Sequence, residues 1–210
     1  MKPAYDALIF DLDGTLWNST VPVTQAWNEA ARALGTGPVS SETIQSIMGL
    51  PHDECFRRAF PHLSESERKR LAAACTQVEM ELLRDHGAML FPGVRDGLQQ
   101  LARKFSLFVV SNCETDYLRI FLKNSGVGNL FRDSECYGNN GLTKGQNLRK
   151  LAARNRLRQP CYIGDTAGDQ QAATAAGMDY YHVNYGFGDP DRECLAFDDF
   201  QAVVAFFFQI

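Results

Sequence analysis

Two carboxylates stand directly after a short apolar run near the N-terminus, and this arrangement restricts the fold more than any other feature. The run ends at Phe10, and Asp11, Asp13 and Gly14 follow it in the string Asp-Leu-Asp-Gly-Thr. If residues 5–10 form a buried parallel strand, the chain leaves that strand at the edge of an open α/β sheet where ligands bind. Side chains two residues apart on an extended chain point to the same side, so we expect Asp11 and Asp13 to face one reacting group.

The same string has two simpler interpretations. Asp-Gly is common in hairpin turns, and a D-x-D-G string occurs in calcium-binding loops. An EF-hand loop, however, needs a third ligand before its glycine and a Glu further on, and residues 15–22 contain no acid. Motif matches stay hypotheses until their context is found.

Further along the chain, polar groups follow two other predicted strands. Residues 105–110 are apolar and partly β-branched, and they end at Ser111 and Asn112. Residues 161–163 lead to a carboxylate, Asp165, and an Ala-rich helical pattern then extends to residue 176.

Two more charged residues lie near predicted helix starts. Lys144 follows a turn-rich stretch and precedes a helical pattern that extends through Ala153. Asp169 lies four residues after Asp165 and belongs to the first turn of the predicted helix.

Together these motifs resemble those of the haloacid dehalogenase superfamily, in which four motifs occur in this order. The resemblance covers nearly the whole chain, because residues 91–94 also resemble the family's return from cap to core. Residues 185–188 resemble a late loop of its phosphoglycolate phosphatase-like members. The four motifs are Asp11-x-Asp13-Gly14-Thr15, Ser111, Lys144 and Gly164-Asp165-x-x-x-Asp169.

The resemblance implies an α/β fold, with a Rossmann-like doubly wound parallel sheet core and an inserted small all-helical cap of the C1 type. We therefore expect a core domain from residues 1–16 and 91–210 and a cap domain from residues 17–90. The pattern of the chain agrees with this division. The segment before Pro92 has helical periodicity and a Ser64-x-x-Glu67 capping box, whereas the second half alternates strand and helix patterns, typical of a parallel sheet with helices on both faces.

The resemblance also implies a role for each motif residue. Asp11 attacks phosphorus and becomes an aspartyl phosphate. Asp13 protonates the leaving oxygen and then takes a proton from the hydrolytic water. Ser111, followed by Asn112, binds the phosphoryl group, and Lys144 keeps Asp11 ionised and neutralises developing charge.

Three carboxylates that converge on a phosphate require a cation. At about 4 Å each like-charged pair among Asp11, Asp13 and Asp165 repels by about 4 kcal/mol at an effective dielectric of 20. Mg²⁺ fits best, since it prefers oxygen ligands and bridges few carboxylates to a phosphate. The resemblance assigns Asp11, Asp13, Asp165 and Asp169 to the metal, with Asp13 contributing its backbone carbonyl. For Asp169, two alternatives stay open: it orients Lys144, or it is an acid favoured by the helix dipole.

Three comparisons with the superfamily narrow the reaction. Haloalkanoate dehalogenases lack the second acid that this chain has at Asp13, and phosphonatases need a cap lysine, for which only the charged-stretch residue Lys69 is present. Phosphosugar mutases of the β-phosphoglucomutase type carry a cap-hinge His where this chain has Val23. We therefore predict hydrolysis of a small phosphomonoester, with phosphoglycolate as the named candidate. A β-phosphoglucomutase-like mutase and a non-catalytic phosphate-binding regulatory protein stay as alternatives.

The sequence restricts the substrate less than it restricts the reaction. The family usually has Asp-Ser where this chain has Asn18-Ser19, which counts against phosphoglycolate without affecting the core chemistry. Residues 49–52 fall where the specificity loop of the cap is expected. His52, Arg57 and Arg58 are candidates for contact with a substrate, although each is also typical of an exposed helix.

Composition restricts the partners and the location. The net charge of −4 gives no basic field for nucleic acid or an anionic membrane. The apolar runs are too short to be a signal segment or to span a membrane. We expect a cytoplasmic protein, a monomer or weak dimer, that acts on a small phosphorylated metabolite. The cysteines are scattered, without a C-x-x-C pair, and are expected to be free thiols. Cys113, two residues past Ser111, is expected to be a small packing residue of the loop, with a position at the border of the site as the alternative.

Overall fold

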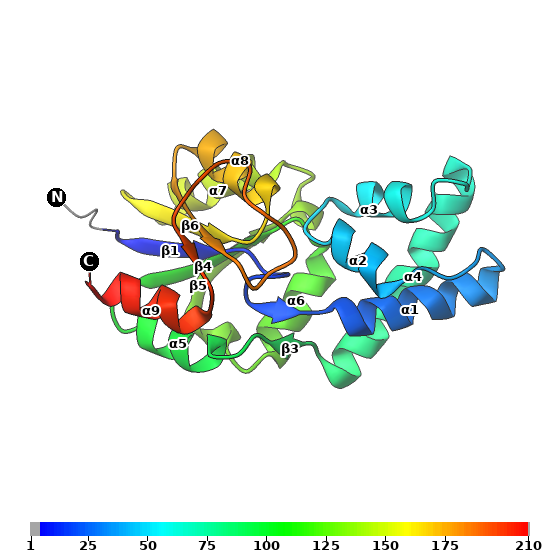
Figure 1. The fold of residues 1–210 in the computed structure, drawn as a ribbon, viewed down its shortest axis with the longest axis horizontal. Helices are drawn as coiled ribbons and strands as arrows, with labels where there is room; N and C mark the ends of the chain where they lie inside the picture. Colours follow the sequence, from blue (N-terminus) through cyan, green and yellow to red (C-terminus); the bar gives the residue numbers. More distant parts are fainter. Residues whose placement is uncertain (1–4, 210) are drawn as a thin grey trace.

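The computed structural model describes residues 5–209, apart from the side chain of His86. Figure 1 shows two parts: a sheet with helices on both sides, and a group of helices at one end of it. The first part contains both ends of the described chain, and the second part is a single insertion after the first strand.

The first part is built on a six-stranded sheet in which every pair of neighbours is parallel. Its order is β5-β4-β1-β6-β7-β8, with β1 near the middle. All four residues of β1 are fully buried, which explains why the sequence there is apolar without alternation. The strands are β1 (Ala7–Phe10), β4 (Ser106–Ser111), β5 (Phe131–Cys136), β6 (Pro160–Gly164), β7 (Asp179–Val183) and β8 (Ala196–Phe197).

Helices cover both faces of this sheet. Alternate side chains of β1 point to opposite faces: Leu8 and Phe10 pack with α5, α6 and α9, whereas Ala7 and Ile9 pack with α7 and α8. The expected doubly wound α/β fold is thus confirmed. The helices are α5 (Val94–Leu101), α6 (Thr115–Asn124), α7 (Lys144–Asn155), α8 (Ala167–Ala176) and α9 (Phe200–Gln209), with short 3₁₀ turns η1 (Gly128–Leu130) and η2 (Tyr137–Asn139).

The second part is all-helical and has its own apolar core. The long helices α1 and α4 pack side by side, and α2 and α3 cover them (Figure 1). Trp27 stacks on Phe56 at its centre, with 4.0 Å between the ring centroids. The predicted capping box is present at Ser64 and Glu67, where α4 starts. The helices are α1 (Thr20–Leu34), α2 (Ser41–Ile47), α3 (His52–Ala59) and α4 (Glu65–His86).

A two-stranded antiparallel ribbon joins the two parts. It pairs β2 (Trp17–Asn18) with β3 (Met89–Leu90). β2 begins one residue after position 16 and β3 ends at position 90, and the division into a core domain and a cap domain at these positions stays a prediction.

Two predictions from composition can be compared with the structure. All six cysteines are free thiols, as expected. Within residues 5–209, the helices are too short or too polar to cross a membrane.

Candidate active site

The carboxyl ends of β1, β4 and β6 bring the motif residues together at the edge of the sheet nearest the cap. Asp11 follows β1 directly, and its backbone N–H donates to the carbonyl of Ile163 at 2.8 Å. The chain then turns at Gly14, where φ is +87°, and a Cβ on this glycine would lie 2.0 Å from Oδ2 of Asp165. Glycine is thus required for the first and last motifs to meet.

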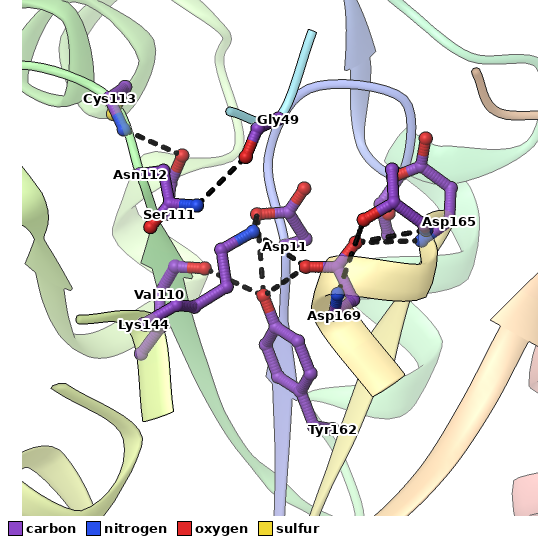
Figure 2. Close-up of polar contacts among 12 residues, drawn as sticks. Asp11, Gly49, Val110, Ser111, Asn112, Cys113, Lys144, Tyr162, Asp165 and Asp169 are labelled. Carbon is purple, nitrogen blue, oxygen red and sulfur yellow. Dashed lines mark hydrogen bonds and ion pairs between the residues drawn. The ribbon is translucent and has the colours of Figure 1, made fainter. Parts of the chain in front are cut away.

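Lys144 connects two buried carboxylates. Its Nζ donates to Oδ1 of Asp11 at 2.8 Å and to Oδ1 of Asp169 at 2.6 Å (Figure 2). Burial would lower the pKa of Lys144, but the two carboxylates hold it above its usual range. The lysine is therefore a fixed cation, placed by the first turn of α7, which Thr143 caps.

Tyr162 contacts the same two carboxylates, Asp11 and Asp169, although it belongs to none of the four motifs. Its hydroxyl donates to the carbonyl of Val110 at 3.0 Å and lies 3.3 Å from Oδ1 of both Asp11 and Asp169 (Figure 2). A buried tyrosine needs a partner for its polar tip. Its position two residues before Gly164 on a buried strand is the only sequence signal for this role.

Both carboxylate oxygens of Asp169 accept hydrogen bonds from other groups of the protein. Its Oδ2 accepts from the backbone N–H groups of Asp165 and Thr166 and from the Thr166 hydroxyl, while Oδ1 faces Lys144. Burial would raise the pKa of Asp169, but Lys144 and the bonds from Thr166 hold it below its usual range. Asp169 thus lies at the helix start and contacts the lysine, as both alternatives to metal binding require, and its assignment to the metal stays a prediction.

Asp165 is held by loops that are distant in sequence. Oδ1 accepts from the Thr15 hydroxyl at 3.0 Å and Oδ2 from the backbone N–H of Phe187 at 2.8 Å. Next to Phe187, a Cβ on Gly186 would lie 2.2 Å from Cβ of Asp165. The late loop therefore needs a glycine to approach this carboxylate so closely.

These carboxylates fit a divalent cation. Oxygens of Asp11, Asp165 and Asp169 lie within 4.8 Å of one another, and all three side chains are buried. The buried Oδ2 of Asp11 has no hydrogen-bond partner among residues 5–209. Burial and the neighbouring Asp169 raise the pKa of Asp11 to about 7. An oxygen-preferring cation such as Mg²⁺ would relieve this repulsion.

The side chain of Asp13 lies outside this metal-fitting group and accepts three hydrogen bonds on one oxygen. Oδ1 accepts from the Tyr117 hydroxyl at 2.5 Å, the Ser19 hydroxyl at 2.7 Å and Nε1 of Trp17 at 2.9 Å. Burial nevertheless raises the pKa of Asp13 above its usual range. Sequence analysis missed all three partners, although Trp17 and Ser19 lie in the same loop as Asp13.

The two predicted phosphate-binding residues differ in their contacts. Ser111 lines the pocket beside Asp13, and its Oγ accepts from the backbone N–H of Cys113 at 3.2 Å. The Asn112 side chain instead donates to the carbonyl of Gly49 at 2.8 Å (Figure 2). Asn112 thus connects the core to the cap loop that was expected to hold specificity residues.

A pocket lies between the cap and the core, with Asp13 and Ser111 at its core side. Its cap walls are mostly apolar, with Trp27 and Met80 among them. The predicted His52 does line this pocket, and its Nε2 lies 3.2 Å from the Thr76 hydroxyl. Burial lowers the pKa of His52 below its usual range, although Glu114 and Asp53 act in the opposite direction.

The two candidate arginines of the cap lie elsewhere. Arg57 and Arg58 both pair with Glu54, and more than half of each side chain is exposed. Neither lines the pocket. They occupy the outer face of α3, because the apolar side of that helix packs on the cap core.

Glu79 is a buried acid that sequence analysis did not identify. It comes from α4, lines the pocket, and is 8% exposed. Its Oε2 accepts from Nε1 of Trp27 at 2.9 Å. Burial raises the pKa of Glu79 to about 7, and the nearby Asp13 adds to the rise.

We predict that Glu79→Gln stabilises the protein at alkaline pH. A carboxyl whose pKa rises from 4.5 in the unfolded chain to about 7 in the folded one costs about 3 kcal/mol of stability once it is ionised. The cost is absent below pH 4.5, grows as the pH rises, and is complete above pH 7. Glutamine keeps the bond from Trp27, so thermal melts at pH 8 should show a midpoint roughly 5–10 °C higher, with much less change at pH 5.

Glu81→Gln is the matched control, because it removes the same charge from an exposed position on the same helix. It should leave both midpoints unchanged. A lower midpoint for Glu79→Gln at pH 8 would contradict the prediction.

Comparisons with known proteins identify the family of this chain. The model of the family described as "Haloacid dehalogenase-like hydrolase" matches residues 8–183. Among curated proteins, the phosphoglycolate phosphatase of Synechococcus elongatus is 32% identical, over 87% of this chain and 85% of its own. The phosphoglycolate phosphatase of Psychrobacter arcticus is 31% identical, over 94% and 93%.

Solved structures share the fold. A crystal structure of a predicted phosphoglycolate phosphatase from Haemophilus somnus has a TM-score of 0.85 and 24% identity, and the match covers 99% of this chain and 100% of that one. The same fold therefore extends over both the sheet part and the helical part.

Proposed function

This chain belongs to the haloacid dehalogenase-like hydrolase family, and from that premise we propose that it is a Mg²⁺-dependent phosphatase that hydrolyses a small phosphomonoester through an aspartyl phosphate. The resemblance inferred from the four motifs is confirmed at the level of the family. Phosphoglycolate is the first ester to test, because curated relatives bear the name phosphoglycolate phosphatase.

The observation that carries the proposal is the unequal environment of the two Asp11 oxygens. Oδ1 accepts from Lys144, whereas the buried Oδ2 has no hydrogen-bond partner among the described residues. A structural carboxylate would satisfy both oxygens, because a buried unpaired acceptor is costly. An oxygen kept free beside a fixed cation suits a nucleophile.

The reaction has two steps on this carboxylate. Oδ2 of Asp11 forms a bond to phosphorus while the ester P–O bond breaks, and Asp13 gives its proton to the leaving oxygen. Water then attacks phosphorus, Asp13 takes a proton from it, and the bond to Asp11 breaks to release phosphate. The raised pKa of Asp13 suits its first role, because the residue must hold a proton before it can give one away.

Several neighbours hold these groups in place. Lys144 balances the charge that develops on the phosphoryl oxygens, and Asp169 and Tyr162 fix the lysine and Asp11. Asp11 and Asp165 would hold Mg²⁺, which when bound supplies positive charge to the phosphoryl oxygens. In this scheme Asp169 is a positioning residue for Lys144.

The test is phosphate release from a panel of small phosphomonoesters. We expect release with Mg²⁺, loss of at least about 100-fold when EDTA removes the metal, and recovery when Mg²⁺ is restored. A second readout is independent of turnover: Mg²⁺ should raise the melting midpoint, because an ion that binds only the folded state stabilises it. Conversion of a phosphosugar without phosphate release would favour the mutase, and no conversion of any ester would favour the binding protein.

The remaining expectations from the sequence stay predictions. They are a cytoplasmic location, a monomer or weak dimer, and a small phosphorylated metabolite as the partner. Size-exclusion chromatography with light scattering measures the oligomeric state directly.

A further inference from the structure

The pocket beyond Asp13 has a charge pattern that restricts the substrate. If the phosphoryl group lies at Asp11, the rest of the ester passes Asp13 and enters the pocket between cap and core. Besides Asp13, Ser111, Asn112 and Tyr117, its polar lining comes from Glu79, Glu114, Thr76 and His52. The leaving group of the ester therefore meets two acids.

The positive charges of the described residues lie outside this lining. Among residues 5–209, no arginine or lysine lines the pocket. The ammonium of Lys144 is held between Asp11 and Asp169, and Arg119 lies on an adjoining outer surface, paired with Asp116. His52 is only partly buried, and its surroundings lower its pKa, which disfavours the charged ring. A substrate carboxylate in this pocket would lack a cationic partner and would lie near the acid Glu79.

Glu79 is more than nine-tenths buried, and only one of its two carboxylate oxygens accepts a hydrogen bond from the described residues. Oε2 accepts from Trp27, but Oε1 has no hydrogen-bond partner among the described residues. The free oxygen belongs to a side chain that lines the pocket. A group that donates a hydrogen bond, neutral or cationic, would complete it.

We propose that the substrate is a small alcohol phosphate whose leaving group carries a hydroxyl or ammonium donor and no carboxylate, and that Glu79 binds this donor. This inference rests on the proposed phosphatase function and specifies its substrate class. The apolar walls at Val23, Trp27 and Met80 hold the carbon chain, and Glu79 selects its polar end. The structure therefore disfavours phosphoglycolate, the ester suggested by the names of the relatives.

Three esters of equal length test the inference. 2-Phosphoglycolate, 2-hydroxyethyl phosphate and 2-aminoethyl phosphate differ only in a terminal carboxylate, hydroxyl or ammonium. For the wild type, we expect kcat/KM of the better donor ester to exceed that of phosphoglycolate at least tenfold. The hydroxyl and ammonium arms identify which donor is preferred.

Glu79→Gln should reduce this ratio at least tenfold, chiefly by raising KM for the donor ester, and Glu81→Gln should leave it unchanged. The ratio distinguishes recognition from a structural role, because damage to the fold would lower all three rates together. Equal or better use of phosphoglycolate by the wild type, or an unchanged ratio in Glu79→Gln, would overturn the inference while leaving the proposed phosphatase intact. Absence of hydrolysis of these esters and of p-nitrophenyl phosphate would overturn the phosphatase proposal and this inference with it.

Discussion

Asp11→Asn is expected to lower kcat/KM by roughly 10⁴-fold or more, the scale at which loss of a covalent nucleophile acts. The amide can place its oxygen toward Lys144, but its nitrogen then takes the position of the free Oδ2 and cannot attack phosphorus. The fold should survive, since the change removes one charge from three crowded carboxylates.

Phosphate release, together with a thermal melt, checks this expectation. The melting midpoint should equal or exceed that of the wild type. An acid-quenched reaction should contain covalent phosphate on the wild type and none on the variant. Mass spectrometry should first exclude reversion of the variant by deamidation. Activity like that of the wild type would then contradict the assignment of Asp11 as nucleophile.

Asp13→Asn is expected to cost about 10²–10⁴-fold with an alkyl phosphate, the usual contribution of a positioned general acid and base. The loss should depend on the leaving group. An alkoxide needs a proton as it departs, whereas p-nitrophenolate leaves without one, so the first step with p-nitrophenyl phosphate should be nearly preserved. The second step still lacks the base that activates water.

Rapid mixing of this variant with p-nitrophenyl phosphate measures the two steps separately. We expect a burst of about one equivalent of p-nitrophenol followed by slow turnover. Tyr117→Phe is the control, because it removes one hydrogen bond to Asp13 but keeps the carboxylate. Equal losses for alkyl and aryl esters, without a burst, would contradict an acid and base role for Asp13.

The three central strands β1, β4 and β6 were predictable because they are short and almost wholly buried. The runs at Ala7–Phe10 and Ser106–Ser111 contain mostly apolar residues, since helices cover both faces. Helix starts were also predictable where a side chain accepts a hydrogen bond from the backbone N–H three residues further on, as at Ser64. Such features can be predicted because the residues that determine them are close together in the sequence.

The supporting contacts of the site were not predictable in this way. Tyr117 reaches Asp13 across 104 positions of sequence, and Trp27 reaches Glu79 across 52. From the sequence alone, Tyr117 and Trp27 are assigned to the apolar sides of amphipathic helices. Helical periodicity indicates which side of a helix is buried, but not which group accepts a hydrogen bond from a tyrosine hydroxyl or a tryptophan N–H. The two candidate arginines failed to reach the pocket for the same reason: their helix turns its charged face outward.

By itself the sequence determined the α/β class, the helical insertion and the set of residues at the strand ends, because each depends on short-range pattern and on motifs in a fixed order. Only the tertiary structure decided which oxygen of Asp11 has no hydrogen-bond partner within residues 5–209 and that both oxygens of Asp169 accept hydrogen bonds from the protein. It also decided that Glu79 lines a pocket to which no lysine or arginine of these residues contributes. These properties arise from the burial of charges next to groups far away in the chain, and burial and proximity exist only once the chain has folded.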